Sequence, residues 1–213
     1  MNEHTVLTKL SNEWDNLDLN KTNLDPAHKF LNRKRTISLN AKRLFQYVPE
    51  FLKPKSVILD VSCGSGASLE VIRCAGADGL GLEFSSISKN KKPLNEEYYK
   101  DVNAYSDYEP CLISQRLNYI VHDCSQTPYP FEDNSFDLVL NYGAITFYGE
   151  PEEWPRILNE FKRISKDTIL CGINVGDKWD RGESIVDKWS DNQKDLTLIQ
   201  KQGSIYKWKF KKS

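Results

Sequence analysis

The residues of this 213-residue chain with the clearest chemical potential lie in the stretch VILDVSCGSG, residues 57–66. Residues suited to a buried strand run there into a turn of small residues, with the acid Asp60 at the junction. The spacing does not fit a dinucleotide-binding turn, because Leu69 stands where the third glycine belongs, and no Lys-Ser/Thr pair completes a phosphate loop. A carboxylate at the mouth of a site repels a pyrophosphate and favours a cation. The turn therefore suits a cationic ligand with an adenosine tail.

Four residues of this stretch form the motif Asp-x-Ser-x-Gly-x-Gly: Asp60, Ser62, Gly64 and Gly66. The motif resembles the glycine-rich first motif of class I S-adenosylmethionine-dependent methyltransferases, usually Asp/Glu-x-Gly-x-Gly-x-Gly, with Ser62 replacing the first glycine. Serine would strain a position that needs positive φ, but it suits a position that needs only a small side chain. Because Gly64 and Gly66 keep the approach to the ligand open, we favour the second interpretation. The resemblance implies that this motif, with Cys63, binds S-adenosylmethionine.

Acids at the ends of two further predicted strands extend the resemblance. Glu83 follows Asp60 by 23 residues, close to the spacing at which an acid binds a ribose hydroxyl. In the family this acid binds both ribose hydroxyls of S-adenosylmethionine, and Phe84 beside it is assigned to the same site. Asp123 and Cys124 resemble the segment that recognises the adenine, where the carboxylate accepts from the exocyclic amine and a backbone N–H donates to the ring.

The stretch NYGAITFY, residues 141–148, begins where the methyl group should meet its acceptor. Asn141 is assigned to cofactor binding and Tyr142 to catalysis. Amino-group methyltransferases acting on DNA bases often show Asn/Asp-Pro-Pro-aromatic here, and both prolines are missing. An oxygen acceptor would gain from a general base, for which the candidates are Tyr142, Tyr99, His122 and, preferred among them, His28 in the basic N-terminal segment. A nitrogen or carboxylate acceptor would need no base.

Short apolar runs alternate with helical stretches, which predicts an α/β fold with a mostly parallel sheet and helices on both faces. After the first strand we expect strands at 79–85, 118–123, 135–143 and 167–174, and helices at 65–75 and 152–164. Two alternating runs within 196–210 predict a hairpin through Gln202 and Gly203. The resemblance implies a Rossmann-like methyltransferase fold of seven strands with an antiparallel last strand.

A single domain is expected from the length. Its parts are predicted as a helical N-terminal cap (1–54), a cofactor-binding core (55–174) with a lid-like insertion (87–116), and a C-terminal helix and hairpin (175–213). Asp137, within the predicted fourth strand, is interpreted as a structural residue. The long insertion and the N-terminal cap should decide the substrate, because loops carry function on a fixed scaffold.

The composition is that of a folded protein, with 39% hydrophobic and 28% charged residues. Five cysteines without a Cys-x-x-Cys pair argue against a zinc site or a disulfide framework, so no metal is predicted. No stretch is apolar and long enough for a signal peptide or a membrane span, and a cytoplasmic protein without membrane contact is expected. The oligomeric state stays open.

The net charge is −1, but basic residues gather in two places. The first cluster comprises Lys29, Arg33, Lys34, Arg35, Lys42 and Arg43, and the second comprises Lys207, Lys209, Lys211 and Lys212. We interpret them as solvated faces of a helix and an edge strand. The alternative is a substrate mouth that attracts phosphate, on a nucleotide-linked sugar or a nucleic acid.

We therefore expect methyl transfer to a small-molecule or sugar-like acceptor. Two rival interpretations remain open. A nucleic-acid methyltransferase is favoured by the basic clusters and disfavoured by the near-neutral net charge and the missing prolines. A non-catalytic, cofactor-binding assembly or regulatory subunit is suggested by Ser62 and by the lack of histidines after the fourth strand.

Overall fold

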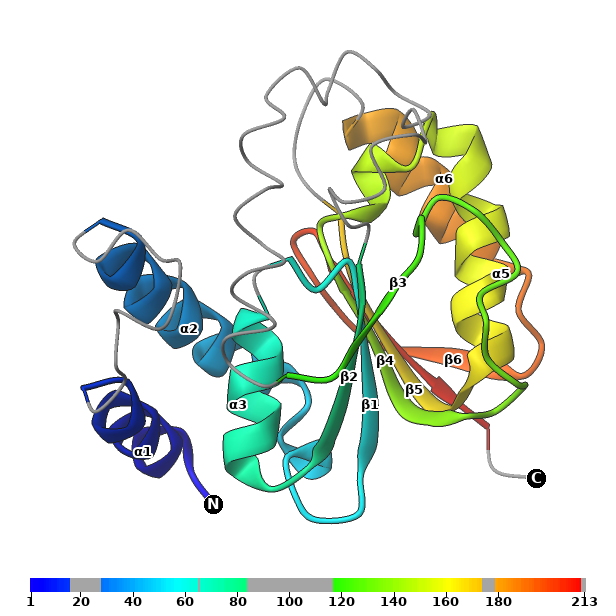
Figure 1. The fold of residues 1–213 in the computed structure, drawn as a ribbon. Helices are drawn as coiled ribbons and strands as arrows, with labels where there is room; N and C mark the ends of the chain where they lie inside the picture. The colour runs from blue at the N-terminus through cyan, green and yellow to red at the C-terminus, as the bar shows by residue number, and fades with distance from the viewer. Residues whose placement is uncertain (16–27, 65, 84–116, 174–178, 212–213) are drawn as a thin grey trace.

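The computed structural model describes residues 1–15, 28–64, 66–83, 117–173 and 179–211; within these ranges the side chains of 14–15, 28–35 and 179–180 are not described. Seven strands form one sheet in the order β3-β2-β1-β4-β5-β7-β6 (Figure 1). Their bounds are β1 (Val57–Val61), β2 (Asp78–Glu83), β3 (Tyr119–Val121), β4 (Phe136–Tyr142), β5 (Ser165–Gly172), β6 (Leu196–Gln202) and β7 (Ile205–Phe210).

The pairing confirms the predicted mixed sheet. From β3 to β5 all neighbouring strands pair in parallel, whereas β7 runs antiparallel to both β5 and β6. The four strands predicted after the first lie within two residues of their expected bounds at each end. Parallel strands are joined by crossover connections, which place helices on both faces of the sheet.

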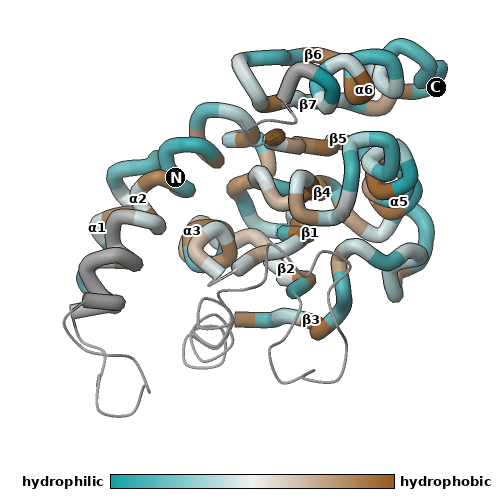
Figure 2. Tube along the Cα trace, turned by 90° about the horizontal axis from the view of Figure 1, so that it is seen from above, coloured by the Kyte–Doolittle hydropathy of each residue, from teal (hydrophilic) through white to brown (hydrophobic). Residues whose placement is uncertain are grey.

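Helices cover the two faces of the sheet in two groups. They are α1 (Glu3–Asp15), α2 (His28–Tyr47), α3 (Ala67–Ala75), α5 (Trp154–Ile164) and α6 (Trp179–Asp191), with short 3₁₀ turns η2 (Pro49–Phe51), η5 (Ile145–Phe147) and η6 (Pro151–Glu153). Seen from above in Figure 2, α1, α2 and α3 lie on one side of the row of strands, and α5 and α6 lie on the other. None of the described helices is both long and apolar enough to cross a membrane.

The alternation of side chains along β4 builds a core on each face. Leu138 and Leu140 pack in the cluster shared with α1, α2 and α3, whereas Val139 between them packs in the cluster shared with α5 and α6. All three side chains are fully buried. Burying each contributes roughly 1.5–3 kcal/mol, so the central strand is held firmly from both sides.

The helix after β1 is bounded by two glycines in the left-handed conformation. Gly66 (φ 77°) precedes α3, and Gly76 (φ 87°) ends it, donating its N–H to the carbonyl of Arg73. The left-handed Gly66 explains why the helix begins at Ala67 and not at the predicted residue 65. Asp137 is structural as predicted, because its Oδ2 accepts from the N–H of Val57 at 2.8 Å.

The C-terminal lysine cluster does not lie on an edge strand, and that expectation is wrong. β7 lies between β5 and β6, because the hairpin inserts its second strand next to β5. Lys207 is buried; its Nζ donates to the carbonyl of Tyr47 at 2.6 Å and pairs with Glu50 at 2.7 Å. It fastens the end of α2 to the sheet. The predicted insertion at 87–116 lies outside the described residues.

Candidate functional site

The carboxyl ends of β1 and β2 bring the two predicted acids together. Asp60 lies in register with Gly81, two residues before Glu83 on the neighbouring strand, and both side chains are buried (3% and 5% exposed). Glu83 reaches the glycine turn, where its Oε2 accepts from the N–H of Gly64 at 2.6 Å. The acid at the end of β2 therefore supports the turn that follows β1.

Asp60 is held in an unfavourable environment for a negative charge. Burial, followed by repulsion from Glu83, raises its pKa to about 7. Among the described residues Asp60 has no ion pair, so the turn carries a carboxylate whose charge the described side chains leave uncompensated. A positive group placed here would be stabilised by that carboxylate.

Ser62 adopts φ 54°, so the interpretation that this position needs only a small side chain is wrong. The chain reverses from β1 into α3 through left-handed residues, and Gly64 (φ 55°) and Gly66 (φ 77°) follow Ser62 in this region. A serine with positive φ costs on the order of 1–2 kcal/mol. A hydrogen bond between the hydroxyls of Ser62 and Tyr148 offsets part of that cost.

The turn packs tightly against β2 on its inner side. The Cys63 side chain is buried against Gly81, where an added Cβ would come within 2.5 Å of its sulfur. Burial and the neighbouring Asp60 and Glu83 raise the pKa of the Cys63 thiol, which favours the neutral form. A Cβ added at Gly64 would meet no described atom within 4 Å, so the described residues leave the outer side of the turn open to a ligand.

The predicted adenine-recognition segment is fixed by local hydrogen bonds. Oδ1 of Asp123 accepts from the N–H of Ser125 at 3.0 Å and from its hydroxyl at 2.6 Å. Cys124 is buried, and its thiol donates to the carbonyl of Leu82 on β2 at 3.5 Å. The segment after β3 is therefore anchored next to the strand that carries Glu83.

Asn141 makes its hydrogen bonds inside the protein. Its Nδ2 donates to the carbonyl of Val61 and to the hydroxyl of Tyr148, both at 3.2 Å, and its Oδ1 accepts from the N–H of Ile145 at 3.0 Å. The side chain joins the end of β1, the end of β4 and the turn η5. Nothing in the pattern of residues 141–148 indicated that the hydroxyl of Tyr148 would meet Ser62.

Tyr142, the last residue of β4, lies beneath an arginine from α2. The guanidinium carbon of Arg43 is 5.6 Å from the centroid of the Tyr142 ring, and the tyrosine hydroxyl is buried without a hydrogen-bond partner among the described residues. Burial, and then the charge of Asp60, raises the pKa of Tyr142, so the hydroxyl stays protonated as a donor rather than acting as a base. Sequence reasoning placed Arg43 only in a basic cluster, not at the site.

A family model described as a methyltransferase domain matches residues 59–168, which run from within β1 through α3, β2, β3, β4 and α5 into the first residues of β5. The chain belongs to the methyltransferase domain family. With the motif at Asp60 and this sheet order, it is a class I S-adenosylmethionine-dependent methyltransferase, an enzyme whose methyl donor is S-adenosylmethionine. No curated protein matches the chain.

Two solved structures resemble this methyltransferase over nearly the whole chain. The PH0226 protein from Pyrococcus horikoshii OT3 has a TM-score of 0.59 at 17% identity, covering 94% of this chain and 99% of that one. Magnesium protoporphyrin IX methyltransferase from Synechocystis PCC 6803, solved with bound SAM, has a TM-score of 0.54 at 13% identity, covering 97% of each chain. At such identities the likeness establishes the shared fold.

Two predicted site residues of the methyltransferase cannot be placed. Phe84 and the side chain of His28 lie outside what the structure describes. Within the described parts of the chain, no three His, Cys, Asp or Glu residues gather in a way that could hold a metal ion.

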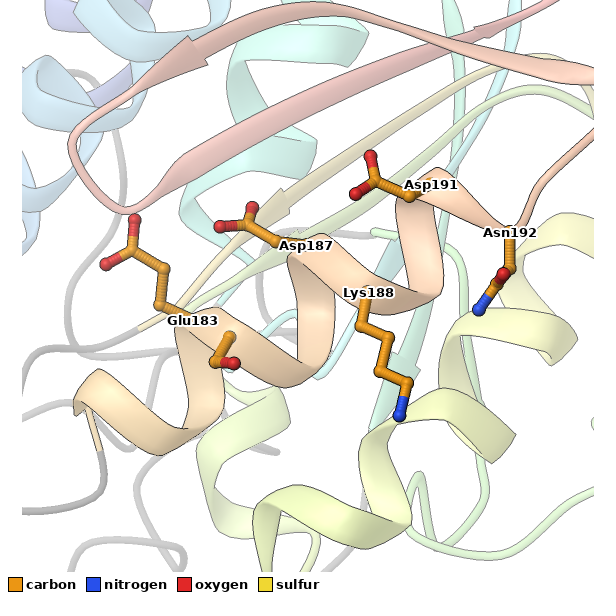
Figure 3. A pocket seen from close by; sticks show the side chains of 6 residues that line it. Glu183, Asp187, Lys188, Asp191 and Asn192 are labelled. Atoms are coloured by element: carbon orange, nitrogen blue, oxygen red, sulfur yellow. The ribbon is translucent and has the colours of Figure 1, made fainter.

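A surface depression elsewhere on the methyltransferase is distinct from this site. It is lined by residues of α6 and the following loop: Glu183, Ser184, Asp187, Lys188, Asp191 and Asn192 (Figure 3). Lys201 of β6 already pairs with Glu183 at 2.7 Å and with Asp187 at 2.9 Å. These acids serve to attach α6 to the edge strand.

Proposed function

We propose that this methyltransferase transfers the methyl group to a small-molecule or sugar-like acceptor, with its cofactor held by the residues at the ends of β1, β2 and β3. The observation that carries the cofactor assignment is the buried Asp60, which lies beside Glu83 and has no ion pair among the described residues. A buried charge is retained when a partner compensates it. The positive charge of S-adenosylmethionine is such a partner.

The other predicted residues fit the remaining parts of the cofactor. Glu83, fixed by the N–H of Gly64, would bind the ribose hydroxyls, and the open outer side of Gly64 leaves room for close approach. Asp123 and Cys124, anchored by Ser125 and β2, would recognise the adenine. When bound, the cofactor supplies a methyl group already activated on a sulfonium. The task of the chain's own residues is then to position the acceptor.

The contacts of Lys207 and Lys209 favour a small acceptor over a nucleic acid. Lys207 is buried against Glu50, and Lys209 pairs with Asp167 at 3.4 Å, so both charges already have an acidic partner. Lys42 and Arg43 on α2 remain exposed. Neighbours on a helix point in different directions, so among the described side chains these two charges do not form the extended basic surface that the several phosphates of a nucleic acid require.

Because Tyr142 stays protonated, it favours a methyl acceptor that needs no general base. A hydroxyl acceptor needs a base to remove its proton as the new bond forms, and Tyr142 is a poor base because burial raises its pKa. A carboxylate acceptor has no proton to lose, and a neutral amine gives an ammonium product that can release its proton to solvent after the transfer. Such acceptors would be methylated through positioning alone, with Tyr142 donating a hydrogen bond.

Calorimetric titration with S-adenosylmethionine and S-adenosylhomocysteine tests the cofactor assignment. We expect micromolar binding, about 8 kcal/mol, to the wild type. Asp60→Asn and Glu83→Gln should each weaken it by about tenfold or more, the value of a charge-assisted hydrogen bond. Asp78→Asn is the matched control, because Asp78 is exposed at the opposite end of β2. Equal binding by all four proteins would overturn the assignment.

The acceptor class is tested with labelled single- and double-stranded DNA and RNA, titrated at 50 mM and 200 mM salt by fluorescence anisotropy. We expect no binding at either salt concentration. Binding that weakens steeply between the two, as counterion release requires, would favour the nucleic-acid alternative.

A further inference from the structure

Arg43 is the exception among the arginines whose side chains are described. Each of the others pairs with a carboxylate within 4 Å: Arg73, Arg156, Arg163 and Arg181. Arg43 is exposed and has no ion pair with any described residue. Its one described partner is the ring face of Tyr142. A cation over an aromatic face keeps the N–H groups at its edge available to an anion.

Arg43 is also held in place from both ends of its helix segment. One turn earlier, Oδ1 of Asn40 accepts from the hydroxyl of Ser68 on α3 at 3.1 Å. One turn later, the hydroxyl of Tyr47 donates to Gln202 at 3.2 Å, and the Tyr47 carbonyl accepts from Lys207 at 2.6 Å. The backbone that carries Arg43 is therefore fixed to α3, β6 and β7, beside the end of β4.

Tyr142 provides the second, independent observation. Its hydroxyl is buried and has no hydrogen-bond partner among the described residues. Burying an unpaired hydroxyl costs about 1–3 kcal/mol, and such groups need an explanation in a native fold. The side chain extends from the last residue of β4, the strand next to β1, two residues beyond the position that pairs with Asp60. The orphan donor thus lies at the acceptor end of the site.

We propose that Arg43 and Tyr142 form a subsite for an anionic group, a carboxylate or a phosphate monoester, on the methyl acceptor. The guanidinium binds the anion with two parallel N–H donors, and the Tyr142 hydroxyl donates a third hydrogen bond. Leu39, one turn before Arg43 and 49% exposed, offers apolar contact to the body of the same molecule. This inference rests on the proposed function, because it names the class of acceptor that the site takes.

The test uses three fluorinated probes of similar size: 4-fluorobenzoate, 4-fluorophenyl phosphate and the neutral 4-fluorobenzamide. Their affinity for the purified full chain is measured by ¹⁹F NMR, with and without saturating S-adenosylhomocysteine, at 20 mM and 300 mM salt. We expect the wild type to bind at least one anionic probe about tenfold more tightly than the amide at low salt. The preferred anion identifies the acceptor group as carboxylate or phosphate.

Three variants locate the contact. Arg43→Gln should abolish the preference for the anion, and Tyr142→Phe, which keeps the ring, should weaken anion binding severalfold. Lys42→Gln is the matched control, because it removes the adjacent exposed charge of α2 and should leave the preference intact. Equal binding of anions and amide by the wild type, or an unchanged preference in Arg43→Gln, would overturn the subsite.

The two proposals fail separately. Failure of the wild type to bind S-adenosylhomocysteine would refute the cofactor site. It would leave the subsite testable, because the anion preference is also measured without that ligand. Normal S-adenosylhomocysteine binding together with no anion preference would refute the subsite alone.

Discussion

Asp60 and Glu160 are both buried carboxylates, but their surroundings differ in kind. Glu160 on α5 accepts from the N–H of Tyr129 at 2.6 Å and from two guanidinium nitrogens of Arg163 at 2.6 and 3.0 Å. Asp60 at the end of β1 has a second carboxylate, Glu83, as its dominant charged neighbour. The hydrogen bonds to Glu160 raise the pKa of Arg163, whereas burial and Glu83 raise the pKa of Asp60 to about 7.

The difference separates a structural acid from a binding acid. The fold supplies Glu160 with a fork of donors from its own helix, so its charge is compensated before any ligand arrives. The carboxylate of Asp60 lacks such compensation among the described residues, so a positive group added beside it would stabilise its charge. A site is therefore found where a buried acid lacks a cation, and not merely where acids are buried.

The largest effect that tests this contrast is expected from Arg163→Met. The change leaves Glu160 buried without its cation, and it should lower the free energy of unfolding by roughly 3 kcal/mol. Urea denaturation at pH 7 measures the loss. Arg181→Met is the control, because that arginine is 55% exposed in its side chain and its surface pairs with Glu150 and Glu152 should contribute little. Similar losses in both variants would mean that Glu160 is no better compensated than a surface acid.

Whereas Arg163→Met should destabilise the protein, Asp60→Asn should remove a loss of stability that the wild type suffers as the pH rises. The folded pKa of Asp60 is about 7 and the ordinary value is 3.8, so between these values the native state holds a proton that the unfolded state has lost. The stability contributed by that proton is complete below about pH 4 and is lost as the pH rises to about 7. Asparagine mimics the protonated acid and removes this loss.

Relative to Asp60→Asn, the wild type should therefore lose roughly 2–3 kcal/mol of stability between pH 5 and pH 8, measured by urea denaturation without cofactor. Asp78→Asn again serves as the control and should follow the wild type. A stability difference between wild type and Asp60→Asn that does not change with pH would show that Asp60 is compensated like Glu160.

The smallest effect is expected at Ser62, where positive φ and a hydrogen bond oppose each other. Ser62→Gly relieves the backbone strain but loses the bond to Tyr148, so its stability should stay within about 1 kcal/mol of the wild type. Ser62→Ala loses the bond and keeps the strain, and it should cost about 1–2 kcal/mol. Thermal denaturation of both variants makes the comparison. Equal stability of the Gly and Ala variants would indicate that the turn is not strained.

The sequence predicted what depends on local pattern. The strands, the helix after β1, the hairpin and the positions of Asp60 and Glu83 at the ends of the first two strands all follow from periodicity and from acids at strand ends. The conformation of Ser62 could not be predicted, because a serine in place of glycine is compatible with either sign of φ. Lys207 was misjudged, since alternation along a strand does not reveal which neighbours the strand will have.

Contacts between residues far apart in the sequence were missed for the same reason. Arg43 and Tyr142 are separated by most of the core, and Tyr142 was assigned to catalysis without its cationic neighbour. Only the packing of α2 beside β4 brings them together, and no local spacing encodes it.

Proton release on cofactor binding shows whether Asp60 faces the positive charge of S-adenosylmethionine. If the positive charge of S-adenosylmethionine compensates Asp60, binding must lower the pKa of that carboxyl and expel its proton. Titrations near pH 7 in two buffers of different ionisation enthalpy give the number of protons released. The wild type should release about half a proton more than Asp60→Asn. Equal release by the two proteins, with binding intact in both, would show that Asp60 does not face the cofactor.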